Sequence, residues 1–256
     1  MTTPMNIVWV SANTFGLELL KTAAALSDVS IQAVITLSEV ATTRMYDGVP
    51  ARAWEDVGIP VVRTERLDED LDVVRRLAPS LLIVAGWRQV LSEGLLTLPS
   101  AGVVGFHPTL LPHGRGSAPI IHSILEGPHE SGVTLFYLNQ GVDTGDIIGQ
   151  EPFCIEESDY ASDVYTKVIG AGRVLVEKYV PLLAQGRAPR VPQDVAHATV
   201  YPRRGLRDNE LLPEDSWETK RRKVRALAPP YDGAFLLRDG QKVIIRTIEE
   251  LEETYA

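Results

Sequence analysis

The chain has 256 residues, of which 45% are hydrophobic and 23% are charged, as is typical of a globular protein with one large or two small domains. Its 25 basic and 34 acidic residues give a net charge of -9, which opposes binding of the whole chain to nucleic-acid phosphates. The apolar runs are far shorter than the roughly 18 residues that a membrane-spanning helix needs, so we expect no membrane partner.

The single cysteine, Cys154, excludes an internal disulfide and a thiolate zinc site, and we expect it to be a small buried side chain. Residues 1–6 carry neither a basic region nor a long apolar stretch, so nothing there marks the chain for export. We therefore expect a cytoplasmic protein.

Short runs rich in Val and Ile alternate with helix-like stretches through the first half of the chain. The alternation predicts an α/β fold, with a doubly wound and mainly parallel sheet. In such a sheet ligands bind along the carboxyl ends of the strands, which directs attention to the residues after Ala85 and around His107. The expected strands are 6–10, 31–37, 61–63, 81–85 and 102–107, and the expected helices are 16–26 and 68–77.

Two further strands are expected at 132–138 and 147–153, and the polar loop between them is too long for a tight hairpin turn. Such a loop is typical of a functional segment. A long helical pattern follows over 159–183 and ends near Gly186 and Pro189.

These boundaries predict a domain over residues 1–186, a linker over 187–200 and a small C-terminal α+β region over 201–256. The small region holds a basic helical stretch and two strands, 234–238 and 241–246. The pair Asp239–Gly240 between those strands is a hairpin signal.

The segment 105–119 has the highest density of chemically informative residues. His107 ends a buried strand, and three prolines, two glycines and Arg115 follow it, which describes a rigid loop at the binding edge. A lone histidine is often only a structural hydrogen-bonding residue, and the acidic turn around Asp143 is a weak signal alone. Together, an aspartate and a histidine at neighbouring strand ends can perform acid–base chemistry.

The ordered motifs of the chain resemble those of the folate-dependent formyltransferases, which include methionyl-tRNA formyltransferase, the phosphoribosylglycinamide enzyme and the sugar N-formyltransferases. The resemblance covers most of the chain and implies that residues 1–186 form the catalytic domain. The motifs are His-Pro-Thr-Leu-Leu-Pro at 107–112, Arg-Gly-Ser-Ala-Pro at 115–119, Gly-Val-Thr at 132–134 and Asp-Thr-Gly-Asp-Ile at 143–147, with further similarity at 85–91, 201–204, 217 and 225–235.

The resemblance implies that the co-substrate is N10-formyltetrahydrofolate and that two strand-end segments line its pterin ring. By position these residues are Gly86, Trp87, Arg88, Gln89, Val90 and Leu91, together with Asn139, Gln140, Gly141 and Asp143.

The implied reaction is attack of a neutral primary amine on the formyl carbon, which places negative charge on the formyl oxygen. By resemblance, His107 stabilises that oxygen and supplies a proton, and Asp143 holds His107 and helps to move a proton from the amine. Arg115 either contacts an anionic substrate or ties down its own loop. Asn13 and Thr14, after the first strand, either bind a substrate phosphate or only cap a helix.

The motif asparagine two residues before the histidine is replaced by Gly105, so one expected amide donor is absent. Losing such a donor typically lowers turnover by about 100- to 1000-fold. The Thr109 hydroxyl or a water is expected to take its place; otherwise the protein is slow, uses another acyl donor or no longer catalyses. A glycine here is also compatible with a backbone conformation that asparagine tolerates less well.

The short C-terminal region indicates the amine. Its two strands and helix cannot close the barrel domain with which methionyl-tRNA formyltransferases grip tRNA, and the acidic stretch 249–253 opposes a polyanion, although the basic stretch 220–225 could contact phosphates. The architecture resembles sugar N-formyltransferases, so we expect a nucleotide-linked amino-dideoxysugar as substrate, no tRNA partner and a homodimer. The alternatives are a methionyl-tRNA formyltransferase or a folate-binding homologue with altered catalysis.

No metal is expected, because His113, His122, His129 and His197 lack zinc-ligand spacing.

Overall fold

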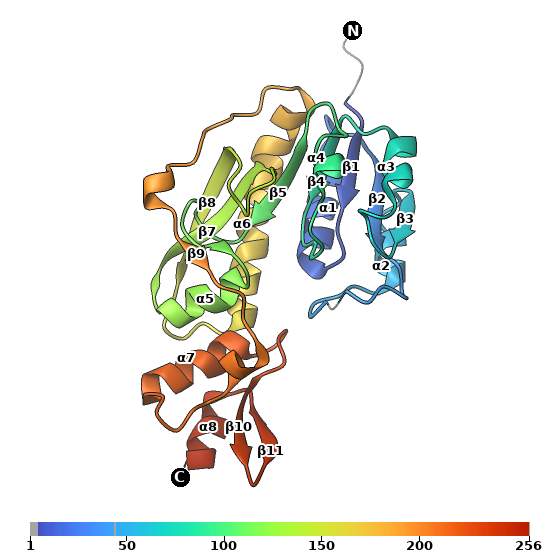
Figure 1. Cartoon of the computed structure of the whole chain (residues 1–256). Coiled ribbons are helices and arrows are strands. Elements are labelled where there is room, and N and C mark those ends of the chain that lie inside the picture. The colour runs from blue at the N-terminus through green and yellow to red at the C-terminus, as the bar shows by residue number, and fades with distance from the viewer. Residues whose placement is uncertain (1–4, 44, 256) are drawn as a thin grey trace.

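A computed structural model of the chain describes residues 5–43 and 45–255. Figure 1 shows a larger body of strands and helices, with a small region at the C-terminal end packed below it. The expectation that nothing marks the chain for export rests partly on residues 1–4, which lie outside the described residues. No helix in the described ranges is long and apolar enough to cross a membrane.

A seven-stranded sheet forms the larger body, in the order β3-β2-β1-β4-β5-β7-β8. The first five strands of that order are parallel, and β7 and β8 are antiparallel to their neighbours, so the predicted mainly parallel sheet is confirmed. The strands are β1 (Ile7–Val10), β2 (Ile31–Leu37), β3 (Val61–Thr64), β4 (Leu81–Val84), β5 (Val103–His107), β7 (His129–Tyr137) and β8 (Ile147–Ile155).

The central strands are apolar throughout because both faces of the sheet are covered. In β1, Ile7 and Trp9 belong to one buried cluster and Val8 and Val10 to another, as the alternation of side chains along a strand requires. The larger helices are α1 (Thr14–Ala24), α3 (Leu71–Leu77), α5 (Pro119–Glu126) and α6 (Ala161–Ala184), and the short ones are α2 (Ala51–Glu55) and α4 (Glu93–Leu96).

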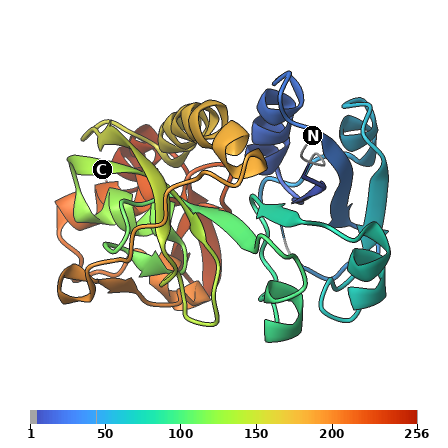
Figure 2. The same cartoon turned by 90° about the horizontal axis from the view of Figure 1, so that it is seen from above.

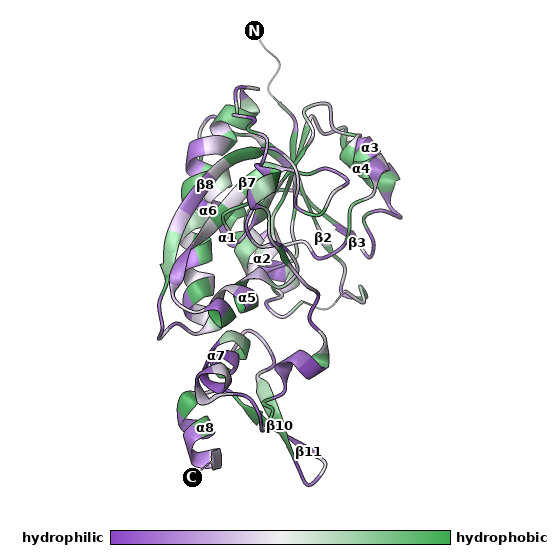
Figure 3. Cartoon of the chain, turned by 60° about the vertical axis from the view of Figure 1, so that its left-hand side comes forward, coloured by the Kyte–Doolittle hydropathy of each residue, from purple (hydrophilic) through white to green (hydrophobic). Residues whose placement is uncertain are grey.

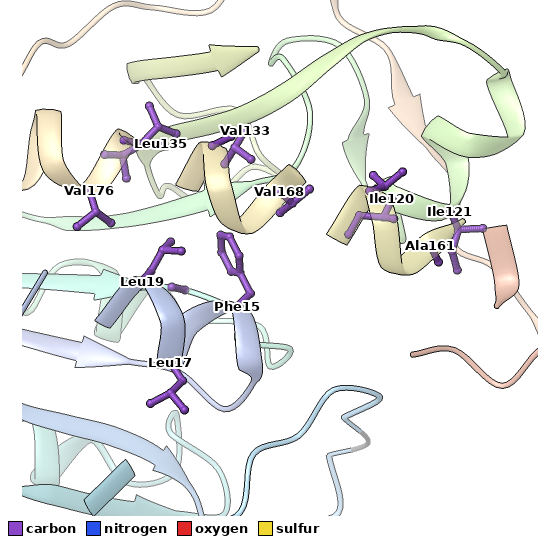
Figure 4. Close-up of a cluster of buried hydrophobic side chains, with 14 of the residues drawn as sticks. Phe15, Leu17, Leu19, Ile120, Ile121, Val133, Leu135, Ala161, Val168 and Val176 are labelled. Atoms are coloured by element: carbon purple, nitrogen blue, oxygen red, sulfur yellow. The ribbon is translucent and has the colours of Figure 1, made fainter. Parts of the chain in front are cut away.

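Helices α1 and α6 pack together over one face of the sheet (Figure 4). Phe15 and Leu19 of α1 point toward Val168 and Val176 of α6. The helices approach closely at Gly172, where an added Cβ atom would lie 2.9 Å from side-chain atoms of both Phe15 and Leu19.

The C-terminal region consists of a hairpin and two helices. Figure 3 shows this region from another side, below the larger body, and Figure 2 shows the whole chain from above. The hairpin is paired across Asp239 and Gly240, both with positive φ, as its turn signal predicts. The elements are α7 (Trp217–Leu227), β10 (Ala234–Arg238), β11 (Gln241–Ile245) and α8 (Ile248–Tyr255).

Between the larger body and this region, the chain does not behave as a free linker. Val191 pairs with Ile147, and the two-residue strand β9 (Val200–Tyr201) pairs with β6 (Arg115–Gly116). Two short 3-10 turns, Val195–His197 and Leu206–Asn209, complete the segment.

One side-chain expectation is wrong: Cys154 is exposed, because it faces outward from the edge strand β8.

Candidate active site

His107 is the last residue of β5, and only 6% of its surface is exposed. Its Nε2 atom lies 2.8 Å from the carbonyl oxygen of Gly114, and its Nδ1 atom lies 3.6 Å from Oδ2 of Asp143. A carbonyl oxygen can only accept, so Nε2 carries a hydrogen and donates it. The Asp143 carboxylate is also an acceptor, so the doubly protonated ring would have an acceptor beside each nitrogen. This arrangement suits a ring that supplies a proton or stabilises a negative oxygen.

Asp143 reaches His107 from an unexpected direction. Tyr137 at the end of β7 pairs with Val104 near the start of β5, so the following loop must run back along β5 to bring Asp143 to its end. Asp143 itself has a φ of 51°, and its Oδ2 atom accepts a 2.8 Å hydrogen bond from the backbone of Gly116. The expected pairing of Asp143 with His107 is therefore present, but a folded-back loop creates it.

Gly105 lies on the same face of β5 as His107, because residues two apart in a strand share a face. The side chain of Leu138 covers it: a Cβ atom added to Gly105 would lie 2.8 Å from Cδ2 and 3.2 Å from Cδ1 and Cγ of Leu138. The expectation that a water or Thr109 fills the space is wrong, because an apolar side chain occupies it. The expected backbone reason also fails, since φ of Gly105 is not positive.

Thr109 and Arg115 are both buried and both bonded within their surroundings. The Thr109 hydroxyl donates to the carbonyl oxygen of His113 at 2.7 Å, so it cannot at the same time donate to a formyl oxygen. Arg115 donates from Nε and Nη2 to the side-chain oxygen of Gln193, at 3.0 and 2.7 Å. Of the two roles considered for Arg115, this geometry favours anchoring the loop.

The segment that follows β4 directs its side chains to different places. Trp87 and Leu91 pack against the same buried cluster as Leu138, and the indole nitrogen of Trp87 is buried with no partner among the described residues. Arg88 lies over the ring of Tyr46, 4.8 Å from its centroid. Val90 is 79% exposed.

Gln89 and the loop after β7 use their polar groups within the fold. The Gln89 amide donates to Thr43 at 2.9 Å and accepts from the backbone of Leu67 at 3.1 Å. Asn139 accepts from the backbone of Gly141 and the hydroxyl of Thr144, at 3.0 and 2.8 Å. These side chains therefore fix the two loops, which leaves backbone groups, the Trp87 indole nitrogen and exposed residues such as Gln140 to meet a ligand.

Trp87, Leu91 and Leu138 pack against one buried cluster, and Leu138 also covers Gly105, two residues before His107. Apolar side chains with a few polar groups among them are typical of a site that binds a flat heterocycle. The unpartnered indole nitrogen of Trp87 is a buried donor of the kind that a bound ligand can satisfy. Among residues 5–43 and 45–255, no cluster of His, Cys, Asp and Glu could hold a metal ion.

Asn13 and Thr14 are held in place by their own neighbours. Asn13 caps α1 by accepting from Gly16 at 3.0 Å, and it also donates to the carboxylate of Asp47 at 2.9 Å. Gly86, with a φ of 65°, lies against the Asn13 side chain, with no room for a Cβ atom. Thr14 donates to the carbonyl of Asp47 from both its backbone and its hydroxyl, at 3.0 Å. The geometry favours helix capping over phosphate binding for both residues.

Asp47 also accepts from the hydroxyl of Tyr165 on α6, which in turn accepts from the backbone of Phe15 at 3.0 Å. Burial, and then the Asp47 charge, raise the pKa of Tyr165 far above its ordinary value. This tyrosine therefore stays neutral and ties the loop that follows β2 to α1 and α6.

The basic stretch on α7 is not free to bind phosphates. Lys223 lies 2.5 Å from Asp215, Arg221 lies 2.8 Å from Glu252, and Arg225 lies 3.2 Å from Glu157. Arg222 pairs with Glu218, and Lys220 is 5% exposed and donates to backbone carbonyls. A polyanion would have to displace these acidic partners.

Residues 5–180 match the formyl transferase family. Among solved structures, the chain is similar to a sugar N-formyltransferase from a Shewanella species, with a TM-score of 0.75, 21% identity and coverage of 94% of this chain and 96% of that one. It is also similar to an N-formyltransferase from Helicobacter canadensis in complex with folinic acid and dTDP-3-aminofucose, with a TM-score of 0.71, 18% identity and coverage of 94% and 86%.

Methionyl-tRNA formyltransferase from Clostridium thermocellum gives a TM-score of 0.62 at 19% identity, with coverage of 94% and 96%. These solved structures have one fold in common, although their names indicate different formyl acceptors. Because the family match spans most of the chain, the protein belongs to the formyl transferase family, as its sequence motifs predict.

Proposed function

We propose that this protein transfers a formyl group from N10-formyltetrahydrofolate to the primary amine of a nucleotide-linked amino-dideoxysugar. The observation that carries the proposal is the pair His107 and Asp143, 3.6 Å apart at the end of β5, with the apolar side chain of Leu138 over Gly105 two residues earlier on the same strand. Two solved neighbours support the acceptor class: one is named a sugar N-formyltransferase, and the other is an N-formyltransferase in complex with dTDP-3-aminofucose.

The residues divide the chemistry between them. The amine nitrogen forms a bond to the formyl carbon, the bond from that carbon to N10 of the folate breaks, and one proton leaves the amine while N10 gains one. His107 donates from the ring nitrogen that faces Asp143 to the formyl oxygen, and Gly114 holds the opposite nitrogen. Asp143 accepts the proton of the attacking amine and passes a proton on to N10 as the bond from the formyl carbon to N10 breaks, which returns the carboxylate to its starting state.

Leu138 makes the oxyanion site of this protein weaker than that of a relative with asparagine at position 105. One amide donor is worth about 100- to 1000-fold in turnover, so we expect a slow enzyme unless the acceptor itself supplies a donor.

The absence of tRNA binding is part of the proposal. The cations of α7 have acidic or carbonyl partners, as described above, and the chain has a net charge of -9. Both features oppose a polyanionic acceptor.

The test is a mass-spectrometric screen of nucleotide aminosugars with N10-formyltetrahydrofolate, for the mass gain of one formyl group in place of a hydrogen. Asp143→Asn should lose the product, whereas the matched exposed variant Asp28→Asn should keep it. Formylation of charged initiator tRNA at a comparable rate would contradict the acceptor assignment, and folate binding without any product would contradict catalysis.

A further inference from the structure

Residues 187–201, between the long helix α6 and the C-terminal region, cross both catalytic loops. Val191 exchanges backbone hydrogen bonds with Ile147, at 2.7 and 2.9 Å, just after the Asp143 loop. Further on, the Thr199 backbone accepts from Arg115 at 3.0 Å, and its hydroxyl accepts from the backbone of Gly114 at 2.8 Å. The segment therefore contacts the loop of Asp143 first and the loop of His107 second.

Gln193 is the side chain of this segment that contacts both loops at once. It is 9% exposed, and its oxygen accepts two hydrogen bonds from Arg115. Its amide nitrogen donates to the carbonyl oxygens of Asp143 and Gly145, at 2.9 and 2.8 Å. Both hydrogens and both lone pairs of the amide are used, so the side chain has one fixed orientation.

The neighbours of Arg115 in sequence hold the two reacting side chains. The carbonyl of Gly114 accepts from His107, and the backbone nitrogen of Gly116 donates to the Asp143 carboxylate. Because Gln193 binds Arg115 on one side and the Asp143 backbone on the other, its length sets the separation between the loops.

We propose that Gln193 is a positioning residue that fixes the distance between His107 and Asp143. The inference depends on the proposed function only in taking these two residues as the reacting pair. Gln193 acts through Arg115 and the loop backbone and does not itself touch the reacting atoms.

Glutamine is the residue type that fits this place. The guanidinium of Arg115 needs an acceptor, and the carbonyls of Asp143 and Gly145 need donors, so one side chain must offer both. A glutamate would keep the bonds to Arg115 but would turn carboxylate oxygen toward two carbonyl oxygens. The variant Gln193→Glu therefore removes one side of the bridge while the buried Arg115 keeps its partner.

The experiment compares Gln193→Glu with Gln241→Glu, a matched change at an exposed site on the hairpin. We expect Gln193→Glu to lower kcat by about 10- to 100-fold, with KM for the folate changed less than about threefold, because a shift of about 1 Å in a reacting group can cost 100-fold. In an Asp143→Ala background the same change should have little further effect on kcat. An equal loss of kcat in both backgrounds, or no loss in either, overturns the proposal.

A second measurement does not require turnover. The ring protons of His107, recorded by NMR at one fixed pH, should change their chemical shifts in Gln193→Glu but not in Gln241→Glu, because the distance from the ring to the Asp143 carboxylate changes only in the first variant. If Gln193→Glu does not fold, Gln193→Asn keeps the amide but is too short to reach both loops, and it should also change the His107 ring resonances at that pH. His107 ring resonances that are unchanged in the folded variants contradict the positioning role, even if the formyl acceptor proves to be different.

Discussion

Substitution of Gly105 tests the most specific departure of this chain from its family. A Cβ atom at position 105 would lie 2.8 Å from Cδ2 of Leu138, closer than side chains tolerate, so Leu138 must move. Leu138 packs against a buried cluster and cannot swing freely. Overpacking of this kind costs about 1 to 3 kcal/mol. At about 2 to 4 °C per kcal/mol for a chain of this size, Gly105→Asn should lower Tm by about 2 to 12 °C.

Turnover should also fall in Gly105→Asn, because Gly105 and His107 share a face of β5 and repacking of Leu138 disturbs that face. Leu138→Ala opens the space, so the double variant should be more stable than the sum of the single changes predicts, by about 0.5 to 3 kcal/mol. In that double variant the amide can reach the formyl oxygen, and turnover should exceed that of Leu138→Ala alone.

The assay combines urea unfolding of the four proteins in this cycle with single-turnover formyl transfer. Gly170→Asn is the control, because apart from the neighbouring backbone of its own helix no atom lies within 4 Å of a Cβ atom added there. Stability changes that add within about 0.5 kcal/mol would refute the role of Leu138. Equal turnover in the double variant and Leu138→Ala would show that position 105 does not face the reacting carbonyl.

Other outcomes follow from the same geometry. Folate at about 100 times its Kd should stabilise the protein by about 2.7 kcal/mol, and calorimetry without any rise in Tm or binding heat would exclude the co-substrate. His107→Ala and Asp143→Ala should each remove most turnover without unfolding the chain, and the double variant should lose little more, whereas fully multiplicative losses would argue against a coupled pair. Filter binding should detect no useful affinity for charged initiator tRNA, and a salt-dependent affinity comparable with that for the small substrate would contradict this. Burial raises the pKa of Tyr165, so its contribution to stability is complete below about pH 10 and is lost as pH rises further. In urea unfolding, the free energy of unfolding of Tyr165→Phe should therefore fall less steeply above about pH 10 than that of the unchanged protein. An equal slope for the two proteins would be inconsistent with this assignment.

Several features could be read from the sequence because they depend on local pattern. The expected runs predicted every strand of the large sheet. The signal is clearest in β1 and β4, because strands buried on both faces must be apolar along their length. Asp239 and Gly240 predicted the C-terminal hairpin, because few other residue pairs adopt positive φ readily. The helix α5 was not predicted, because Pro119 at its start was taken as part of a loop motif although proline is favoured in a first helical turn.

The pairing of His107 with Asp143 was predictable as a hypothesis but not as a geometry. The family motifs named the two residues, whereas the antiparallel pairing of β7 with β5 decided that the loop runs back along the strand. The domain boundary at residue 186 stays a prediction.

Leu138 and Gln193 were missed because nothing near them in sequence marks their role. Leu138 is the first residue after a strand, and Gln193 lies among prolines in a segment without periodicity. Their partners Gly105 and Arg115 lie far away along the chain, and only the order of strands in the sheet brings them together. The sequence alone determined which residue types could carry the chemistry, because these follow from local motifs. The tertiary structure alone decided what fills the space beside them and what fixes their distance, because those contacts form only when the distant strands and the crossing segment are packed.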